Sequence, residues 1–552
     1  MVTVILFLCL LNGAYGHENV LAKTNYGIVK GTSSIIDNKA MFCYLGVPYA
    51  KPPTGSRRFK QPEPPNSWSG VRDAVTLGPK CPQLDELDPF DPTPISEDCL
   101  NLNIYSPTEP TSQGTAPSTS LLPVMVWIHG GSFSMGSGSK YNGSVLASRG
   151  VVVVTVNYRL DILGFLSTAD SIIPGNFGLL DQIMALQWIQ ANIQFFGGDP
   201  QMVTIFGESS GAACVSLLVL SPLSKGLFQR AILESGSSLA YWSITYPVNK
   251  IQPDTIAQSI ASKLNCTQLS STEILVCLQK VNVFDLINAS TEYRKSNGLV
   301  FIPRVEALLR SLPDYPLKIL RSGNFNHVDT IRGYNSDEGW YFLNTSSAQL
   351  TREGFRESIH NLMTSLKIMT SDSIVDQFEE VYIKNLTDTS LIFRQGLRAV
   401  SDFVFIAPIV METMLAETWS RDSKHYLYEF QYRPSDSEMP PFVGAVHGNE
   451  QAFLFRSFDN DQFWNTKKGH TQADLLISDE MMAFWSSFAK HGSPNGNMSG
   501  LAPWVNYTPD RPNCLKINIL TTLSDHGKQL AVQIYKPLID SLMNEYPVTV
   551  VG

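Results

Sequence analysis

The pentapeptide Gly-Glu-Ser-Ser-Gly at residues 207–211 places Ser209 between two glycines, with one residue on either side. A serine hydroxyl attacks a carbonyl carbon once a base removes its proton and hydrogen-bond donors hold the resulting oxyanion. The pattern Gly-x-Ser-x-Gly arises by chance in about one chain in five of this length, taking Gly and Ser at roughly 7% each. The pentapeptide therefore makes Ser209 a candidate nucleophile, and the rest of the sequence must supply its partners.

The residues on either side of Ser209 predict a strand, a sharp turn and a helix. Residues 203–206 are Val-Thr-Ile-Phe, and residues 211–220 are typical of the start of a buried helix. A nucleophile elbow requires this context, and its glycines let the backbone turn without Cβ clashes. The helix N-terminus favours negative charge developing beside the serine. A phosphate-binding turn or a merely tight turn is the alternative.

Two consecutive glycines after another apolar run are candidates for an oxyanion hole. Residues 127–133 read Trp-Ile-His-Gly-Gly-Ser-Phe. We expect the backbone amides of Gly131 and Ser132, together with that of Ser210, to be the donors. Loss of one such donor typically costs about 3 kcal/mol of transition-state stabilisation. A loop without a catalytic role is the alternative interpretation.

An acidic pair follows a further predicted strand. Residues 333–340 read Gly-Tyr-Asn-Ser-Asp-Glu-Gly-Trp and precede six histidines. The order serine, acid, histidine is the one that accompanies a nucleophile elbow. Asp337 or Glu338 could orient an imidazole and stabilise its charged form. The spacing does not choose between them, and a solvated acidic turn is the alternative.

The later histidines differ in their surroundings. His447 lies in Gly-Ala-Val-His-Gly-Asn-Glu, a glycine-flanked loop after the strand-like residues 425–432, and we expect it to be the base. His491, at the expected end of a helix, is the rival base. His360 lies in a helical stretch and is expected on the surface.

Short apolar runs alternate with helical segments through the middle of the chain. Residues 179–196, between the apolar runs at 150–159 and 202–207, carry apolar residues at helical spacing. This alternation predicts an α/β fold with a mostly parallel central sheet flanked by helices. The active site of such a sheet lies beyond the carboxyl ends of its strands. The apolar runs are residues 123–131, 150–159, 202–207, 228–237 and 327–335.

Composition narrows the classes of protein. The 552 residues are 43% apolar and 16% charged, with a net charge of −9. An acidic balance argues against a nucleic-acid binder, which needs a basic footprint. Residues 107–120 resemble a surface loop, and no repeat or long linker divides the chain. We expect one large domain over residues 17–552.

The N-terminus predicts export. Residues 1–16 have the shape of a secretory signal peptide and are too short to span a membrane. The C-terminus carries neither an ER-retention tetrapeptide nor an anchor tail, so we expect a secreted protein without a stable membrane anchor. Glycosylation sequons support this route. They are Asn142, Asn265, Asn288, Asn344, Asn385, Asn497 and Asn506.

Seven cysteines follow the predicted signal peptide. An oxidising compartment lets near neighbours pair, which suggests the short loops Cys81–Cys99 and Cys266–Cys277. Each disulfide would stabilise the fold by about 3 kcal/mol in the loop-entropy model. No Cys/His cluster has zinc spacing, so we expect no metal.

Segments in one order along nearly the whole chain resemble the type-B carboxylesterase and cholinesterase family of the α/β-hydrolase fold. The resemblance implies Ser209 as the acyl-forming nucleophile, Glu338 as the acid and His447 as the base. It suggests Ser235 as a hydroxyl near the histidine, with Glu208 as a second supporting residue, and it supports both disulfides. The segments are residues 44–59, 96–107, 127–133, 196–200, 206–212, 333–340 and 446–450.

The chain departs from the family pattern in two places. A third glycine is usual where Ser132 stands, so Ser132 must present its amide with a side chain attached. A cholinesterase-like disulfide near the C-terminus would use Cys514, but no partner stands in the matching upstream region. Cys43, Cys214 and Cys514 are therefore expected to be free thiols.

The choice of ester depends on the loop between Cys81 and Cys99. In cholinesterases this loop carries a tryptophan that binds quaternary ammonium by cation–π attraction, whereas here it offers only Phe90. Trp340, Tyr341 and Trp242 could still line a gorge. The loop favours uncharged esters over choline esters. Juvenile-hormone-esterase-like enzymes usually have Gln before the nucleophile, so Glu208 argues against membership of the juvenile-hormone-esterase-like branch.

The sequence thus predicts an esterase that works without a cofactor, through an acyl-enzyme on Ser209. A cholinesterase is the alternative within the family. A non-catalytic adhesion protein like the neuroligins is the alternative from another class. Its expected signs are a degraded triad, a membrane span and a cytoplasmic tail.

Overall fold

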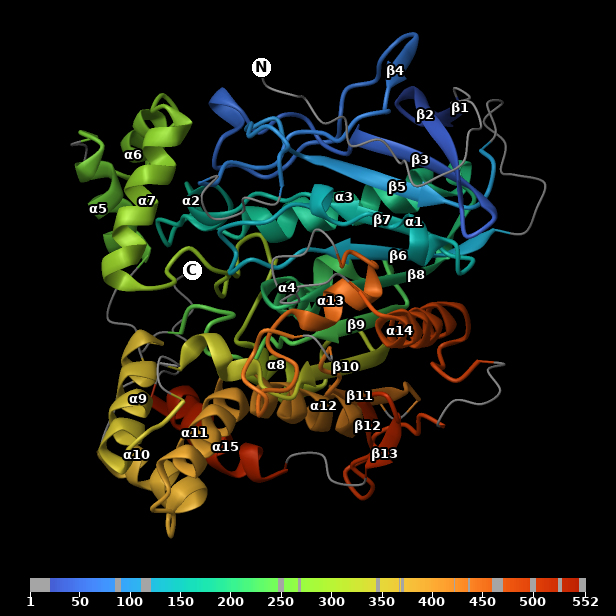
Figure 1. Ribbon diagram of the computed structural model, residues 1–552. Coiled ribbons are helices and arrows are strands. Elements are labelled where there is room, and N and C mark those ends of the chain that lie inside the picture. The colour runs from blue at the N-terminus through green and yellow to red at the C-terminus, as the bar shows by residue number, and fades with distance from the viewer. Residues whose placement is uncertain are drawn as a thin grey trace, which may run out of the picture.

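One large mixed sheet organises the chain, with β4 paired to β2 at one edge (Figure 1). In this computed structural model the strands follow the order β1-β2-β3-β5-β7-β6-β8-β9-β10-β11-β12-β13. The structure describes residues 20–84, 91–110, 121–246, 253–266, 270–343, 348–366, 368, 372–420, 422–434, 437–458, 470–496, 503–524 and 529–545.

The strands are β1 (Val20–Thr24), β2 (Gly27–Ile36), β3 (Lys39–Pro48), β4 (Val71–Asp73), β5 (Asn101–Ser106), β6 (Leu122–Ile128), β7 (Val152–Val156), β8 (Gly198–Glu208), β9 (Arg230–Glu234), β10 (Asp329–Asn335), β11 (His425–Phe430), β12 (Cys514–Ile517) and β13 (Thr522–Ser524). The strands from β7 through β12 are parallel to one another. At one edge the successive neighbours β1, β2, β3, β5 and β7 are antiparallel to one another. At the other edge β13 is antiparallel to β12.

The helices are α1 (Ser144–Ala147), α2 (Asp161–Phe165), α3 (Phe177–Asn192), α4 (Ser210–Leu220), α5 (Pro253–Lys263), α6 (Ser271–Leu278), α7 (Val283–Asn297), α8 (Pro316–Ser322), α9 (Arg352–Ser365), α10 (Asp372–Phe378), α11 (Thr389–Ser401), α12 (Ala407–Trp419), α13 (Asn449–Leu454), α14 (Gln472–His491) and α15 (Gln529–Glu545). Two π-helical turns, Glu379–Ile383 and Asp402–Ile406, and short 3₁₀ helices such as Glu338–Phe342 complete the fold.

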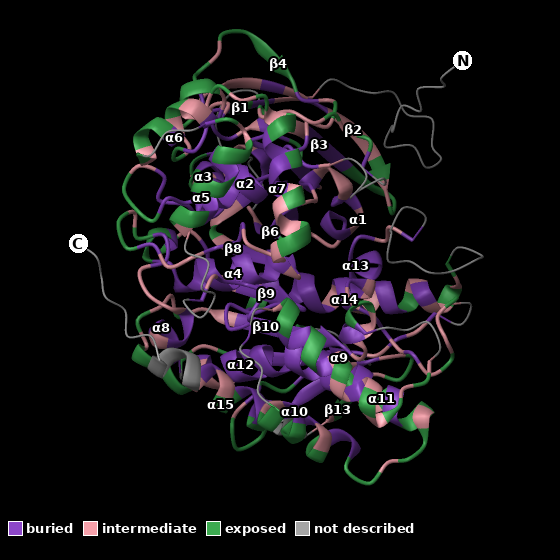
Figure 2. Cartoon of the chain, turned by 90° about the vertical axis from the view of Figure 1, so that its left-hand side faces the viewer, coloured by how far each residue is buried: buried purple, intermediate pink, exposed green. Residues whose placement is uncertain are grey.

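Both faces of the parallel strands are buried, which explains their continuous apolar runs. In β6, Val124, Val126 and Ile128 belong to one hydrophobic cluster, shared with α3 and α4. Met125 and Trp127 belong to a second cluster, shared with α13 and α14. Figure 2 shows the buried strands at the centre, with exposed residues concentrated on the outer helices and loops.

The predicted α/β fold with a parallel centre is confirmed, and each of the five apolar runs overlaps a strand. The run at residues 179–196 forms α3 and a short 3₁₀ helix, Ile193–Phe196. The antiparallel strands at the N-terminal edge had not been predicted. Residues 1–16, and residues 111–120 of the expected surface loop, lie outside the described part of the chain.

The two expected disulfides, Cys81–Cys99 and Cys266–Cys277, are present. Cys43, Cys214 and Cys514 are buried and form no disulfide within the described residues. Among the predicted sequons, Asn344 and Asn497 lie outside the described residues. The asparagines at 142, 265, 288, 385 and 506 are exposed.

A continuous helical stretch, Thr389–Trp419, is long and apolar enough to cross a membrane by those two criteria alone. Its most apolar window is 89% buried inside the protein, in the manner of a core helix. The stretch is therefore weak evidence for a membrane span.

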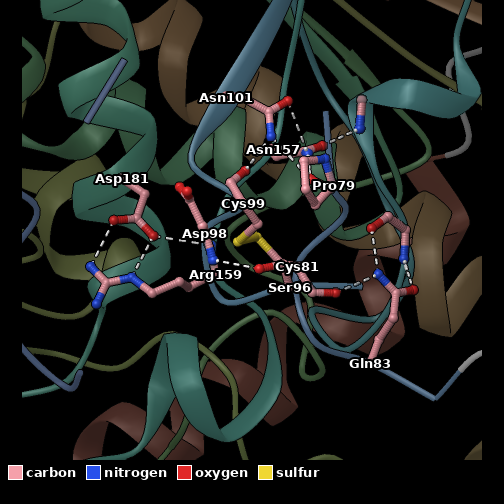
Figure 3. The surroundings of a disulfide bond; sticks show 12 residues. Pro79, Cys81, Gln83, Ser96, Asp98, Cys99, Asn101, Asn157, Arg159 and Asp181 are labelled. Atoms are coloured by element: carbon pink, nitrogen blue, oxygen red, sulfur yellow. Dashed lines mark hydrogen bonds and ion pairs between the residues drawn. A yellow bond between two sulfur atoms is a disulfide. The ribbon is translucent and has the colours of Figure 1, made fainter. Parts of the chain in front are cut away.

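A buried ion pair lies close to the first disulfide. Figure 3 shows Arg159 and Asp181 beside Cys81 and Cys99. Arg159 donates from Nε to Asp181 Oδ2 and from Nη2 to Asp181 Oδ1, each at 2.7 Å. Both side chains are almost fully buried. Removing one partner of such a pair leaves the other charge buried without a counter-charge or water to solvate it.

We predict that Asp181→Asn lowers the free energy of unfolding by about 3–5 kcal/mol, because the Arg159 guanidinium loses its counter-charge in a buried site. Urea denaturation at neutral pH measures this. Asp376→Asn is the matched control, since Asp376 pairs with Arg356 while 63% exposed, and it should cost under about 1 kcal/mol. Equal losses in the two variants would contradict the prediction.

Candidate active site

Ser209 occupies the sharp turn between β8 and α4. Its backbone has φ 55° and ψ −124°, a conformation that costs energy for any residue with a side chain. Its N–H donates to the Glu234 carbonyl at 2.8 Å, which ties the turn to the end of β9. The turn places Ser209 at the carboxyl end of the parallel strands, as the sequence predicts for an elbow.

The two glycines of the pentapeptide allow a close approach to β6. A Cβ on Gly207 would lie 2.4 Å from the Ile128 carbonyl oxygen, and a Cβ on Gly211 would lie 2.1 Å from it. Neither glycine has a positive φ, whereas Ser209 does. The glycines therefore avoid Cβ clashes, as the sequence predicts, and the clashes avoided are with the end of β6, while Ser209 itself takes the strained backbone conformation.

A continuous hydrogen-bonded chain joins Ser209, His447 and Glu338. His447 Nε2 lies 2.9 Å from Ser209 Oγ, and His447 Nδ1 lies 2.6 Å from Glu338 Oε2. An ionised carboxylate only accepts, so we assign the proton of this bond to Nδ1, which leaves Nε2 free to accept from the serine hydroxyl. Glu338 is fully buried, and its Oε1 accepts the Asn335 N–H at 2.7 Å.

The alternatives that the sequence left open lie elsewhere. Asp337 Oδ2 accepts the Gly444 N–H at 2.8 Å, so this carboxylate holds the loop that leads to His447. His491 is exposed at the end of α14, and His360 is exposed on α9. Of the candidate acids and bases, Glu338 and His447 are the pair joined to Ser209.

The expected oxyanion loop follows β6 and lies against the elbow. Gly131 has φ 110°, while Ser132 and Phe133 have φ 54° and 59° although neither is glycine. Among the described residues, none accepts a hydrogen bond from the backbone N–H of Gly131, Ser132 or Ser210. These amides are therefore available to an oxygen atom bound next to Ser209.

Several carboxylates surround the imidazole of His447. Burial lowers the pKa of His447, but the negative charges of Glu208 and Glu338, with that of Glu450, outweigh it and raise the pKa to about 9. Glu208 Oε1 lies 3.3 Å from His447 Nε2. Burial, followed by the charge of Glu338, raises the pKa of Glu450 to about 7. The pKa of the buried Glu234 is raised well above its usual value, chiefly by desolvation.

Ser235, expected near the histidine, reaches the site through Glu450. Its Oγ donates to Glu450 Oε1 at 3.4 Å. Asn335 donates from Nδ2 to Glu450 Oε2 and to the Val446 carbonyl, the latter at 2.8 Å. Glu450 therefore links the segments that carry Glu338 and His447. Sequence reasoning gave Glu450 no role, although it stands in the motif around His447.

The ring of Phe405 packs against the His447 imidazole and belongs to a small aromatic cluster. The Phe405 ring centroid lies 4.4 Å from that of His447 and 5.6 Å from those of Phe342 and Trp242. Trp242 also lies 6.5 Å from the Phe133 ring. Sequence reasoning named Trp242 but missed Phe405, which lies in an apolar helical run that carries no motif.

The other aromatic expectations have mixed outcomes. Trp340 packs near Phe393, with ring centroids 6.5 Å apart, and Tyr341 is half exposed. Phe90 lies outside the described residues. Among the described residues, no group of three or more His, Cys, Asp and Glu side chains is arranged to hold a metal ion.

A doubly flanked sheet with this elbow at its carboxyl edge is an α/β-hydrolase fold. A model of the carboxylesterase family matches residues 18–535, and the chain belongs to that family. The chain is a carboxylic ester hydrolase.

Individual relatives span almost the whole chain. Cocaine esterase of Oryctolagus cuniculus is 35% identical over 95% of this chain and 97% of its own length. Acylcarnitine hydrolase of Mus musculus is 36% identical over 88% of this chain and 85% of its own length. Neuroligin-2 of Mus musculus is 35% identical over 90% of this chain, which corresponds to 64% of the neuroligin.

We predict that Glu208→Gln shifts the acidic limb of the kcat/KM pH profile toward lower pH. Glu208 stabilises the protonated imidazole, so removing its charge lowers the pKa of His447 and leaves the base neutral at a lower pH. Hydrolysis of p-nitrophenyl acetate from pH 5 to 10 measures the limb. Glu63→Gln, which removes an exposed carboxylate paired with Lys51, should leave it in place. An unmoved limb in Glu208→Gln would refute the assignment.

Proposed function

We propose that the chain hydrolyses uncharged carboxylic esters by two-step acyl transfer, with Ser209 as nucleophile, His447 as base and Glu338 as acid. The observation that carries the proposal is the hydrogen-bonded chain from Glu338 through His447 to Ser209. These hydrogen bonds supply both requirements of a serine nucleophile, a base within reach and a carboxylate that orients the base.

In the first step, His447 Nε2 takes the proton of Ser209 while Oγ attacks the ester carbonyl carbon. The amides of Gly131, Ser132 and Ser210 hold the negative oxygen of the tetrahedral intermediate. The intermediate collapses as the C–O bond to the alcohol breaks, and the alcohol leaves with the proton from His447. Water then repeats both steps on the acyl-enzyme, which releases the acid and restores Ser209.

The surroundings of His447 support an uncharged ester. The Phe405 ring packs against the His447 imidazole, with the rings of Phe342 and Trp242 next to it, and such apolar surroundings favour apolar acyl or alcohol groups. The related enzymes carry names as different as cocaine esterase and acylcarnitine hydrolase, so family membership leaves the ester open.

The neuroligin relatives make an adhesion protein the second candidate. The bonded Ser209, His447 and Glu338 side chains argue for the enzyme, because an adhesion surface has no need of them. For its location, we propose a signal peptide at residues 1–16 and a single secreted, glycosylated domain at residues 17–552. The five exposed sequon asparagines are accessible to glycosylation.

We predict that Ser209→Ala and His447→Gln each lower kcat for p-nitrophenyl acetate by about 10⁴- to 10⁶-fold, because each removes a group that acts in every turnover. Initial rates on purified protein measure this. His491→Gln, at the exposed rival, should retain the parental kcat. Turnover that survives His447→Gln but not His491→Gln would move the base to His491, and full turnover by Ser209→Ala would falsify the mechanism.

The substrate class has its own test. Neutral p-nitrophenyl butyrate should give a higher kcat/KM than acetylthiocholine by about tenfold or more, since no tryptophan stands in the loop between Cys81 and Cys99 to bind a quaternary ammonium group. Parallel measurements at pH 8 and at low and moderate salt decide the matter. The reverse preference at both salt levels would identify a cholinesterase.

A further inference from the structure

The side-chain hydroxyl of Ser210 lies between the two halves of the proposed oxyanion hole. Ser210 begins α4 directly after the nucleophile and is fully buried. Its Oγ accepts the backbone N–H of Phe133 at 3.2 Å. Phe133 follows Gly131 and Ser132, whose amides are the other proposed donors. One hydrogen bond therefore connects the elbow to the loop.

The loop needs such a connection because its backbone is unfavourable. Ser132 and Phe133 are consecutive non-glycine residues at φ 54° and 59°. Conformations of this kind persist only where the surrounding contacts impose them. The Phe133 carbonyl accepts the Asp161 N–H at 2.7 Å, and its ring packs near Phe165 at 5.6 Å. These contacts hold Phe133 from one side, and Ser210 holds it from the elbow.

Neighbouring turns with positive φ are held in place by hydrogen bonds between backbone groups. Ser209, Ser235 and Asp161 also have positive φ, and each donates its N–H to a backbone carbonyl of an adjacent segment at 2.7–2.8 Å. Phe133 is the member of this group whose N–H relies on a side chain. Replacing the Ser210 side chain with a methyl group or a hydrogen atom would leave the buried Phe133 N–H without its acceptor.

We propose that the Ser210 hydroxyl is a positioning group, which holds the amides of Gly131 and Ser132 at the correct distance from the amide of Ser210. The inference rests on the proposed acyl-transfer mechanism. It assigns Ser210 two separate tasks: its amide binds the oxyanion, and its hydroxyl sets the place of the other two donors. A shift of the loop would weaken binding of the transition state more than binding of the substrate.

The test compares Ser210→Ala and Ser210→Gly with Ser216→Ala. Ser216 lies on the same helix and is equally buried, and its hydroxyl bonds to Glu412 at 2.8 Å, away from the loop. The readouts are kcat and KM for p-nitrophenyl butyrate per titrated active site, the melting temperature, and Ki for an alkyl trifluoromethyl ketone. This ketone forms a tetrahedral adduct with a serine nucleophile, so its affinity reports the oxyanion hole.

Both Ser210 variants should lose about tenfold in kcat, less than the 10²–10³-fold typical of a deleted donor. KM should stay within about twofold, and Ki should rise about tenfold. The acidic limb of the pH profile should not move, because His447 keeps its partners. Ser216→Ala should lower the melting temperature while kcat and Ki stay unchanged.

Parental kcat and Ki in Ser210→Ala and Ser210→Gly would overturn the inference while leaving the mechanism intact. Equal kcat and Ki losses in Ser216→Ala would also overturn it, because they would assign the effect to helix stability. Full activity of Ser209→Ala would instead overturn the mechanism, and the two failures are thereby distinguishable.

Discussion

The close approach of the elbow to the end of β6 is the constraint on which the site depends. Strands β6 and β8 are adjacent and parallel, so the loop after β6 and the turn after β8 emerge at the same edge. Only because Gly207 and Gly211 lack a Cβ can the elbow pack against the Ile128 carbonyl. That contact, together with the bond from the Phe133 N–H to Ser210 Oγ, holds the loop after β6 against the elbow. The parallel strands β10 and β11 then bring Glu338 and His447 to the same edge.

The electrostatics of the site depend on the carboxylates that lie around His447 at this edge of the sheet. Glu208 and Glu338 flank the two nitrogens of one imidazole, at 3.3 and 2.6 Å. Such an arrangement favours a protonated imidazole at His447, which is the species that the proposed mechanism forms when His447 takes the proton of Ser209. Further carboxylates close to a buried site would repel one another. Burial, together with the charge of a neighbouring carboxylate, accordingly raises the pKa values of Glu450 and Glu234.

Sequence reasoning succeeded where local pattern and chain order carry the information. Apolar runs ending in polar or glycine turns located the central parallel strands from β7 through β10, and their common edge predicted where Ser209, an acid and a histidine would meet. Spacing could not choose between Asp337 and Glu338, because adjacent side chains in a turn point in directions that only the fold fixes. Phe405 and the Ser210 hydroxyl could not be found either. Their contacts reach across many residues, to His447 and Phe133, and neither stands in a pattern that predicts a partner.

Several strained backbone positions lie just after the strands that carry the proposed chemistry. Ser209 follows β8, Ser132 and Phe133 follow β6, Ser235 follows β9 and Asp161 follows β7, and all five have positive φ without being glycine. Hydrogen bonds from one strand end to the next compensate this cost: Ser209 to β9, Ser235 to β10, and Asp161 to the loop after β6. Each strained turn is thus fixed by its neighbour across the edge of the sheet. A set of mutually dependent turns can hold a nucleophile and its oxyanion donors in one geometry without drawing on any ligand, which is what preorganisation requires.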